Sequence, residues 1–233
     1  MMKPFSRLGI SGSIPTSLIW RQPKFSEDHY ELVDQPAGEA LFATIGWPKW
    51  LSDQAVARSA FGIWYFDRLG WTRRTITATR PAKPGDDASS EDRPTYERLA
   101  SFEVGWFWEG DLTLSSGEVF HWYSTKAFHN AWAMTEVLPA ETGEEDKPGR
   151  IERKRGLFRL GRKPKPPRRE RLVYEIEFGM RWLKQEAWIN LPARQAVNAA
   201  ELTFLLCLGM YLGYCFNQDS AAAVAASSTV AVS

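Results

Sequence analysis

Between Tyr30 and Ile189 the chain alternates short runs of aromatic and β-branched residues with clusters of turn residues. The alternation has the period of two that places successive side chains on opposite faces of a β-strand. We therefore expect strands near residues 30–33, 40–45, 61–66, 71–79, 102–108, 111–114, 118–123, 130–137, 172–180 and 181–189. Roughly ten to twelve short strands with turn signals every 8–12 residues or so predict a sandwich or a barrel.

Two strands show the alternation most clearly. Phe102, Val104, Trp106 and Trp108 fall on one face of the first. On the second, the apolar positions are separated by Val173, Glu175 and Glu177, which fall on the opposite face. These apolar positions are Leu172, Tyr174, Ile176, Phe178 and Met180. Each strand therefore has one side to bury against a core.

The segments around these strands lack the alternation with a period of two. Residues 1–27, with Pro4, Pro15 and Pro23, read as an irregular N-terminal arm. The polar stretches 82–93 and 142–171 read as loops, and structureless loops as long as the second are usually functional or disordered. Residues 217–233 are rich in Ala, Ser and Val and read as a disordered low-complexity tail.

One C-terminal segment is apolar on every side. Asn190 is a candidate N-cap and Pro192 suits a first helical turn, so we expect a helix from about Pro192 to Phe216. Within it, the stretch 202–216 has no charged residue. Such a helix is enclosed in a protein core or spans a membrane.

Length favours the core over the membrane. Fifteen residues (202–216) make a helix of about 22 Å, short of the roughly 30 Å hydrocarbon core, and a longer span would include Glu201. Gly209 and Gly213 fit close packing in either setting. Closing the sheet around this helix would bury the apolar strand faces and leave no sheet edge. The expected fold is mainly β, an about twelve-stranded closed antiparallel barrel around a hydrophobic C-terminal helix, and a membrane tail anchor is the alternative.

The order of these elements resembles the tubby C-terminal-like superfamily, which includes the phospholipid scramblases and the plant LURP-one-related proteins. The resemblance rests on Tyr30–Asp34 with Gly38, the expected turn Phe66–Gly70, the stretch Gly110–Gly117 leading to Phe120–Trp122, and the helix Leu202–Phe216. It implies one barrel domain, residues 28–216, with a central helix at 192–216. Some tubby-like domains bind phosphoinositides through basic surface residues, but that pocket has no residue match in this chain. The acidic calcium loop and the cysteine cluster of scramblases are likewise absent from the sequence.

The charge balance hides a local asymmetry. The 233 residues contain 29 Lys and Arg and 28 Asp and Glu, for a formal net charge of +1. From Arg150 to Arg171, eleven Lys or Arg against two acidic residues give +9, which leaves −8 on the rest of the chain. This excludes a uniformly basic nucleic-acid binder and leaves one basic loop on an acidic body.

This basic loop is the strongest functional feature of the sequence. Near an anionic membrane each Lys or Arg contributes up to about 1 kcal/mol, and buried apolar residues such as Phe158 add to it. The alternatives are a solvated insertion, or contact with nucleic acid or an acidic protein. The candidate lipid- or anion-binding residues are Arg153, Lys154, Arg155, Arg159, Arg162, Lys163, Lys165, Arg168 and Arg169.

Catalytic and cofactor signatures are weak. Residues 156–163 space two glycines like a phosphate-binding loop, but Arg162 and Lys163 stand where that motif needs Lys and Ser or Thr. His121 and His129 could meet Asp111 or Glu118 across strands, yet no histidine has metal-site spacing. The Trp-rich strands suit a core better than a ligand platform.

Cys207 and Cys215 lie roughly 12 Å apart on one helix, too far for a disulfide, which predicts reduced, inert thiols and a cytosolic setting. The N-terminal stretch has no apolar run typical of a signal peptide. We therefore expect a non-enzymatic, cytoplasmic bacterial protein without cofactor or metal. Its expected partner is the surface of an anionic membrane. A tail-anchored protein with the 202–216 segment as the span, and an enzyme that uses His121 or His129, are the competing hypotheses.

Overall fold

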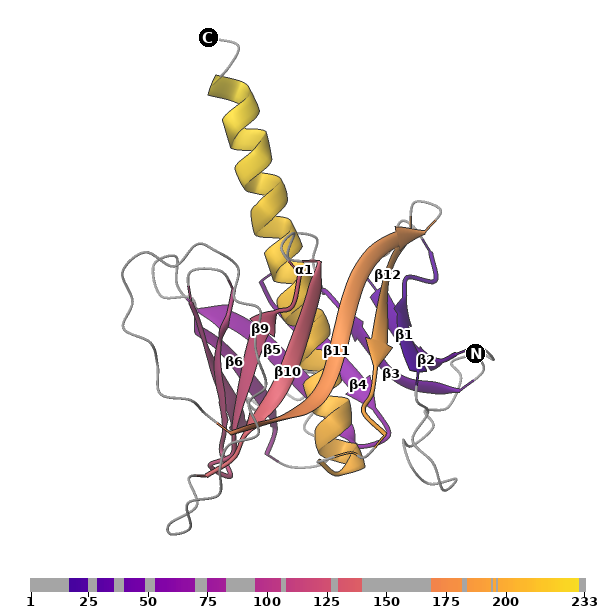
Figure 1. Ribbon diagram of the computed structural model, residues 1–233, viewed down its shortest axis with the longest axis vertical. Coiled ribbons are helices and arrows are strands. Elements are labelled where there is room, and N and C mark those ends of the chain that lie inside the picture. Colours follow the sequence, from indigo (N-terminus) through magenta and orange to yellow (C-terminus); the bar gives the residue numbers. More distant parts are fainter. Residues whose placement is uncertain are drawn as a thin grey trace.

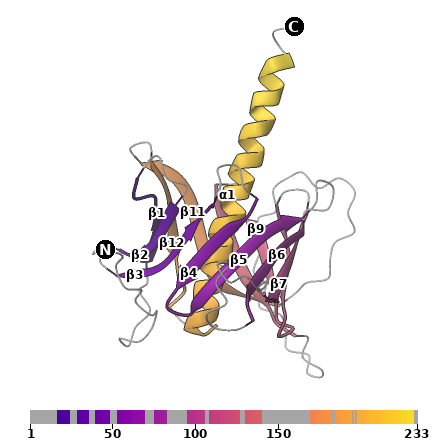
Figure 2. The ribbon, with the colours of Figure 1, turned by 180° about the vertical axis from the view of Figure 1, so that it is seen from behind.

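Twelve strands form a closed antiparallel barrel in which each strand pairs with its neighbours in sequence, and β1 pairs with β12 (Figures 1 and 2). The computed structural model describes residues 17–24, 29–35, 40–48, 53–69, 75–82, 95–105, 108–126, 130–139, 169–181, 184–193, 195 and 197–230. This architecture confirms the predicted fold class. The strands are β1 (Ser17–Arg21), β2 (His29–Asp34), β3 (Leu41–Gly46), β4 (Ala55–Ser59), β5 (Gly62–Leu69), β6 (Thr75–Pro81), β7 (Tyr96–Val104), β8 (Gly110–Leu114), β9 (Val119–Ser124), β10 (Ala131–Val137), β11 (Glu170–Arg181) and β12 (Lys184–Asn190).

The helix α1 (Ala199–Val230) runs through the barrel and projects beyond it (Figure 1). Every residue from Leu202 to Cys215 is at most 9% exposed, which confirms that the apolar segment is a core helix in this structure. Among the described residues, one helical stretch, Ala199–Ala222, is long and apolar enough to cross a membrane, and 78% of its most apolar window is buried inside the fold.

Both ends of α1 differ from the expected bounds. The helix begins at Ala199 because Asn198, not Asn190, caps it: Asn198 Oδ1 accepts a hydrogen bond from Glu201 N at 2.9 Å. Asn190 instead ends β12, where it pairs with Ser17. At the other end α1 continues past Phe216 to Val230, through residues whose high Ala content favours a helix.

Two strands, β1 and β4, were not predicted, and β5 is longer than predicted. β1 lies in the stretch that the sequence assigned to an irregular arm, and β4 lies in a segment without a clear period. The Phe66–Gly70 stretch was read as a turn. This was wrong, because β5 continues to Leu69 with Asp67 and Arg68 paired to β6.

The inward faces follow the predicted alternation in part. On β7 Phe102 is buried as expected, but the strand ends at Val104, so buried Trp108 lies beyond it. On β11 the alternation breaks at a bulge, and Leu172 is not part of the core. Tyr174 and Ile176 of β11 are buried as expected. Val173, expected on the outer face, is fully buried and belongs to the core, because a bulge inserts it between the pairs Met134–Tyr174 and Thr135–Leu172.

Two glycines on one face of α1 let β11 approach the helix. A methyl group at Gly209 would overlap the hydroxyl of Tyr174, and one at Gly213 would overlap the ring of Phe178. Tyr174 Oη also donates a hydrogen bond to the carbonyl oxygen of Leu205 at 2.8 Å. The small-residue pair therefore serves contact between helix and barrel.

We expect Gly213→Ala to destabilise the protein although Ala is the better helix former by about 1 kcal/mol. The added methyl group forces the Phe178 ring out of place, and overpacking of this kind costs about 1–3 kcal/mol. Chemical denaturation measures the difference. Asn217→Ala, at an exposed site on the same helix, is the control and should be neutral or stabilising. A stabilising Gly213→Ala would contradict this packing.

We expect Leu206→Arg to prevent folding, because Leu206 is fully buried and an unpaired buried charge costs about 3–5 kcal/mol, a large part of a typical folding free energy. Soluble yield and far-UV circular dichroism report the result. Ala222→Arg, at an exposed position of α1, should leave both unchanged. A folded Leu206→Arg protein released from membranes would instead identify the segment as an anchor.

Candidate functional site

Nearly all of the predicted binding loop lies outside the described residues, and its last candidate, Arg169, lies at its base. The eight candidates from Arg153 to Arg168 belong to the connection between β10 and β11 that the structure does not describe. At the base of this connection, the amide N–H of Leu138 donates a hydrogen bond to the carbonyl oxygen of Arg169 at 3.0 Å. The two ends of the loop are thus joined directly beside the barrel.

Side chains reinforce this base. Arg171 donates to Glu136 Oε2 through Nη2 at 2.6 Å, and Thr135 Oγ1 donates to Glu170 Oε2 at 3.0 Å. Because Arg171 is engaged by Glu136, part of the +9 charge is neutralised where the loop leaves the barrel. The candidates between Arg153 and Arg168 lie beyond this base in the sequence.

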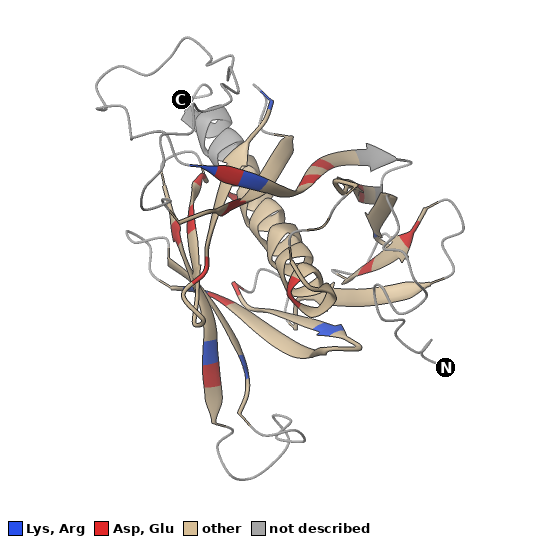
Figure 3. Ribbon diagram, turned by 60° about the horizontal axis from the view of Figure 1, so that its bottom comes forward, with Lys and Arg blue, Asp and Glu red and all other residues tan. Residues whose placement is uncertain are grey.

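The end of the barrel that carries this base also holds the carboxylates of Glu118, Glu136 and Glu201. We name it the entry end, because α1 enters the barrel there. Glu201 lies in the first turn of α1, and burial, followed by the charges of Glu118 and Glu136, raises the pKa of its carboxyl group. Figure 3 shows acidic residues spread over several strands of the barrel. Three carboxylates therefore lie near the end of the barrel from which the basic loop starts, beside Arg169 and Arg171.

The histidine pairing considered from the sequence is present for His121. Its Nδ1 lies 2.8 Å from Asp111 Oδ1 on the neighbouring strand, and the ring stacks on Tyr123. His129 lies outside the described residues. Within the described ranges no group of three or more His, Cys, Asp or Glu residues could hold a metal ion. One histidine oriented by a carboxylate indicates by itself no particular reaction.

The thiols are buried in the core as predicted. Burial raises the pKa of Cys207, and it raises the pKa of Cys215 to about 12. A thiol with so high a pKa carries almost no thiolate near neutral pH, so neither cysteine is a nucleophile in the folded protein.

Four of the tryptophans considered as a ligand platform are core residues. Trp64, Trp108, Trp122 and Trp132 are at most 6% exposed, and the last two stack with ring centroids 5.3 Å apart. Trp71 and Trp106 lie outside the described residues. The interior of the barrel is therefore filled by these rings and by α1.

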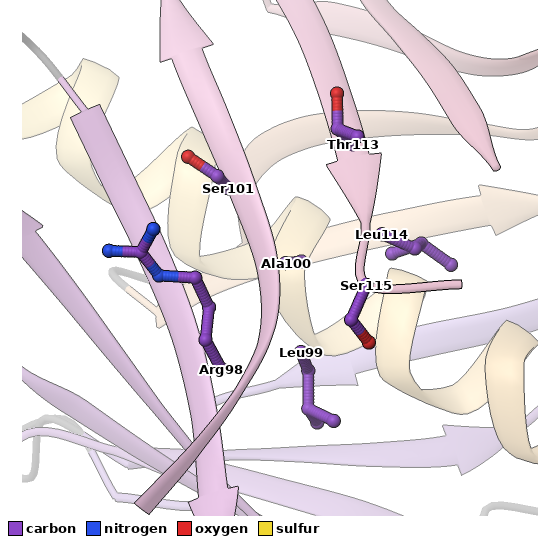
Figure 4. Close-up of a pocket in the computed structure, with 7 residues that line it drawn as sticks. All are labelled: Arg98, Leu99, Ala100, Ser101, Thr113, Leu114 and Ser115. Atoms are coloured by element: carbon purple, nitrogen blue, oxygen red, sulfur yellow. The ribbon is translucent and has the colours of Figure 1, made fainter. Parts of the chain in front are cut away.

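A shallow pocket of about 190 Å³ lies between β7 and β8 (Figure 4). In Figure 4 the hydroxyl groups of Ser101 and Ser115 point away from each other. Its polar groups do not converge on one point, as those of a specific ligand site do. The lining residues are Arg98, Leu99, Ala100, Ser101, Thr113, Leu114 and Ser115.

The sequence did not predict one ion pair, which we call the Arg68–Asp219 clamp. It joins α1 to the barrel where the helix leaves it, which we name the exit end. Arg68 of β5 donates two hydrogen bonds to Asp219 of α1, at 3.0 and 3.2 Å, and its guanidinium lies 5.3 Å from the centre of the Trp108 ring. Burial alone would lower the pKa of Arg68, but the hydrogen bonds and charge of Asp219 outweigh it and raise the pKa. The two partners are 151 residues apart, so no local pattern could indicate the pair.

Comparison with known proteins identifies no relative: no family model, no curated protein and no solved structure matches this chain.

We expect the Arg68–Asp219 pair to contribute more to stability than an exposed ion pair. The side chains of Arg68 and Asp219 are 18% and 28% exposed, and a hydrogen-bonded charge pair of this kind contributes about 1.5–3 kcal/mol. A double-mutant cycle with alanine at both positions, followed by denaturation, measures the coupling energy. The Arg80–Glu97 pair, with side chains about half exposed, is the control and should give about 0.2–1 kcal/mol. Equal couplings would contradict a stabilising clamp.

Proposed function

We propose that this barrel is a non-enzymatic binding module that associates peripherally with anionic phospholipid through the basic loop 150–171. The observation that carries the proposal is the local charge of +9 in a chain whose remainder carries −8. Eleven cations around Leu157, Phe158 and Leu160 match the chemistry of a reversible lipid contact, in which charge attracts the segment and apolar side chains insert.

The base of the loop supports this proposal. The backbone hydrogen bond between Leu138 and Arg169 and the Arg171–Glu136 pair fix both ends of the connection on a rigid barrel. A loop closed at its base concentrates its charges in a limited volume, which favours simultaneous contact with several lipid headgroups.

We further propose that the chain is a distant tubby- or scramblase-like protein. The support is the order of its elements: twelve antiparallel strands in sequence, followed by a hydrophobic helix through their barrel. The tail-anchor alternative would need Leu202–Phe216 in lipid, where the barrel would lose the residues that fill its interior. The peripheral mode is therefore the better supported one.

To test this, we would change Arg153, Lys154, Arg155, Arg168 and Arg169 to Ser together. Each cation contributes up to about 1 kcal/mol at an anionic surface, so we expect binding to fall by roughly 100-fold or more. Co-sedimentation with phosphatidylcholine vesicles, with and without phosphatidylserine, measures binding. An unchanged circular dichroism spectrum shows that the fold is intact.

Two matched variants distinguish an effect of the loop from a general effect of removing positive charge. Lys154→Ser with Arg155→Ser removes two cations from the loop, and Arg58→Ser with Arg98→Ser removes two exposed cations from the barrel wall. Only the first pair should weaken binding to phosphatidylserine vesicles. Equal effects, or binding by the five-fold variant at moderate salt, would refute the role of the loop.

A further inference from the structure

The hairpin of β6 and β7 extends past its neighbours at the entry end of the barrel. β6 pairs with β7 as far as Pro81 but leaves β5 two residues earlier, and β7 pairs with β8 only from Ala100 onward. Figure 4 shows β7 continuing beyond the point at which β8 turns away at Ser115. Residues 80–82 and 95–98 therefore form a two-stranded ribbon that no other described strand flanks.

The two edges of this ribbon differ in their hydrogen-bonding groups. The carbonyl oxygen of Thr95 accepts a hydrogen bond from the amide N–H of Ala82 at 2.8 Å, so the backbone groups of residue 95 face β6. Because this direction alternates along a strand, the backbone groups of Tyr96 and Arg98 face away from β6, where no described strand pairs with them. The opposite edge holds Pro81, which has no N–H to donate. Only the β7 edge of the ribbon therefore presents both donors and acceptors.

The side chains along the β7 edge suit a binding surface. Natural proteins block exposed sheet edges, often with proline, yet this edge is left open. Tyr96 is 42% exposed and is one of two large apolar side chains that are exposed among the described residues. It packs edge to face on Tyr65, with ring centroids 5.2 Å apart. Arg98 is exposed and lies two residues from Tyr96, so the two share one face, whereas Glu97 lies on the other face and is bound by Arg80 at 2.8 Å.

The shallow pocket of about 190 Å³ lies at the end of this edge. It is lined in part by Arg98, Leu99 and Ser115, and the carbonyl oxygen of Leu99 accepts a hydrogen bond from the amide N–H of Ser115 at 2.7 Å where β7 and β8 separate. A cavity of about 150 Å³ can hold a benzene molecule, so the pocket has room for one side chain. Glu118 lies in the turn after Ser115, so an apolar side chain suits the pocket better than an acidic one.

We propose that the β7 edge of the ribbon, Tyr96–Arg98, binds an extended peptide segment of a partner protein, which adds as an antiparallel strand with an acidic residue opposite Arg98. In this mode of recognition the main-chain hydrogen bonds provide affinity, and pockets for alternate side chains provide specificity. An opposite charge across from Arg98 and a β-branched residue across from Tyr96 are the stabilising cross-strand pairs. The next side chain on the same face would reach the pocket beside Leu99.

A second copy of this chain fits the edge less well than a peptide. Antiparallel pairing of two such edges centred on Glu97 or on Arg98 would place like charges directly opposite each other, which is destabilising. Three residues of strand are only about 10 Å long, so the contact would bury far less than the roughly 800 Å² per partner of a stable interface. A short peptide, by contrast, can follow the edge and continue into the pocket.

This surface is independent of the basic loop, because it lies on β7 whereas the loop joins β10 and β11. The two binding activities can therefore be lost separately. The variant with Arg58→Ser and Arg98→Ser should still bind phosphatidylserine vesicles but should bind the peptide more weakly.

The test uses the full chain and a fluorescein-labelled probe peptide, Leu-Thr-Glu-Thr-Val-Thr, in which Val would face Tyr96 and Glu would face Arg98. Fluorescence anisotropy measures its binding. N-methylation of the Glu and Val nitrogens removes the two donors that would face the edge, so we expect binding to fall about tenfold or more. N-methylation of the two Thr that precede them is the matched control, because their N–H groups would face away, and it should leave binding unchanged.

Charge reversal tests the side-chain contact. The connection 83–94 carries four acidic and two basic residues, so the preference for an acidic peptide is tested at Arg98 itself. Arg98→Glu should weaken binding about tenfold, and a probe with Lys in place of Glu should restore it. Arg58→Glu, at another exposed cation of the wall, is the control and should have little effect.

Three results of these measurements would overturn the proposal: no binding of the probe by the unchanged protein, equal loss from both N-methylated peptides, or equal effects of Arg98→Glu and Arg58→Glu. Self-association in analytical ultracentrifugation that Arg98→Glu abolishes would also overturn it, because a second copy would then occupy the edge.

Discussion

The structure depends on filling the inside of a closed twelve-stranded barrel. A barrel of this size has an interior wider than the side chains of its strands can fill, and an empty apolar interior would forfeit the packing that stabilises the fold. Helix α1 occupies this space. The strands leave room for it by placing small residues inward, although alanine is depleted in strands generally. These fully or nearly fully buried alanines are Ala43, Ala55, Ala57, Ala78, Ala100 and Ala187.

The same constraint fixes the position of α1 along the barrel axis. Gly209 and Gly213 face Tyr174 and Phe178 of β11, so a shift of the helix by one turn would leave a glycine against only one of these rings and bring Leu205 or Asn217 against the other. Asn198 caps the helix at the entry end. The Arg68–Asp219 pair holds it at the exit end. Core packing, a cap and an ion pair therefore specify a single register.

Because the helix has a direction, the two ends of the barrel differ chemically. The entry end combines the base of the basic loop with Glu118, Glu136 and Glu201. The exit end combines the Arg68–Asp219 pair, exposed Leu69 and the uncharged continuation of α1. The proposed lipid contact of the basic loop belongs to the entry end, where both ends of the loop join the barrel.

The sequence by itself determined the class of fold. Alternation with a period of two indicated ten of the strands, and the apolar segment 202–216 indicated a core helix, because both are local consequences of burying one side of a strand or all sides of a helix. The basic loop and the buried thiols could also be predicted from the local sequence. Tertiary structure alone decided the rest. β1 is held in the barrel by pairing with β12, more than 160 residues away, and the Arg68–Asp219 clamp joins residues 151 apart. The proximity of Glu118, Glu136 and Glu201 follows only from the antiparallel closure of the barrel, since a sequence records order along the chain and not which ends of its strands meet in space.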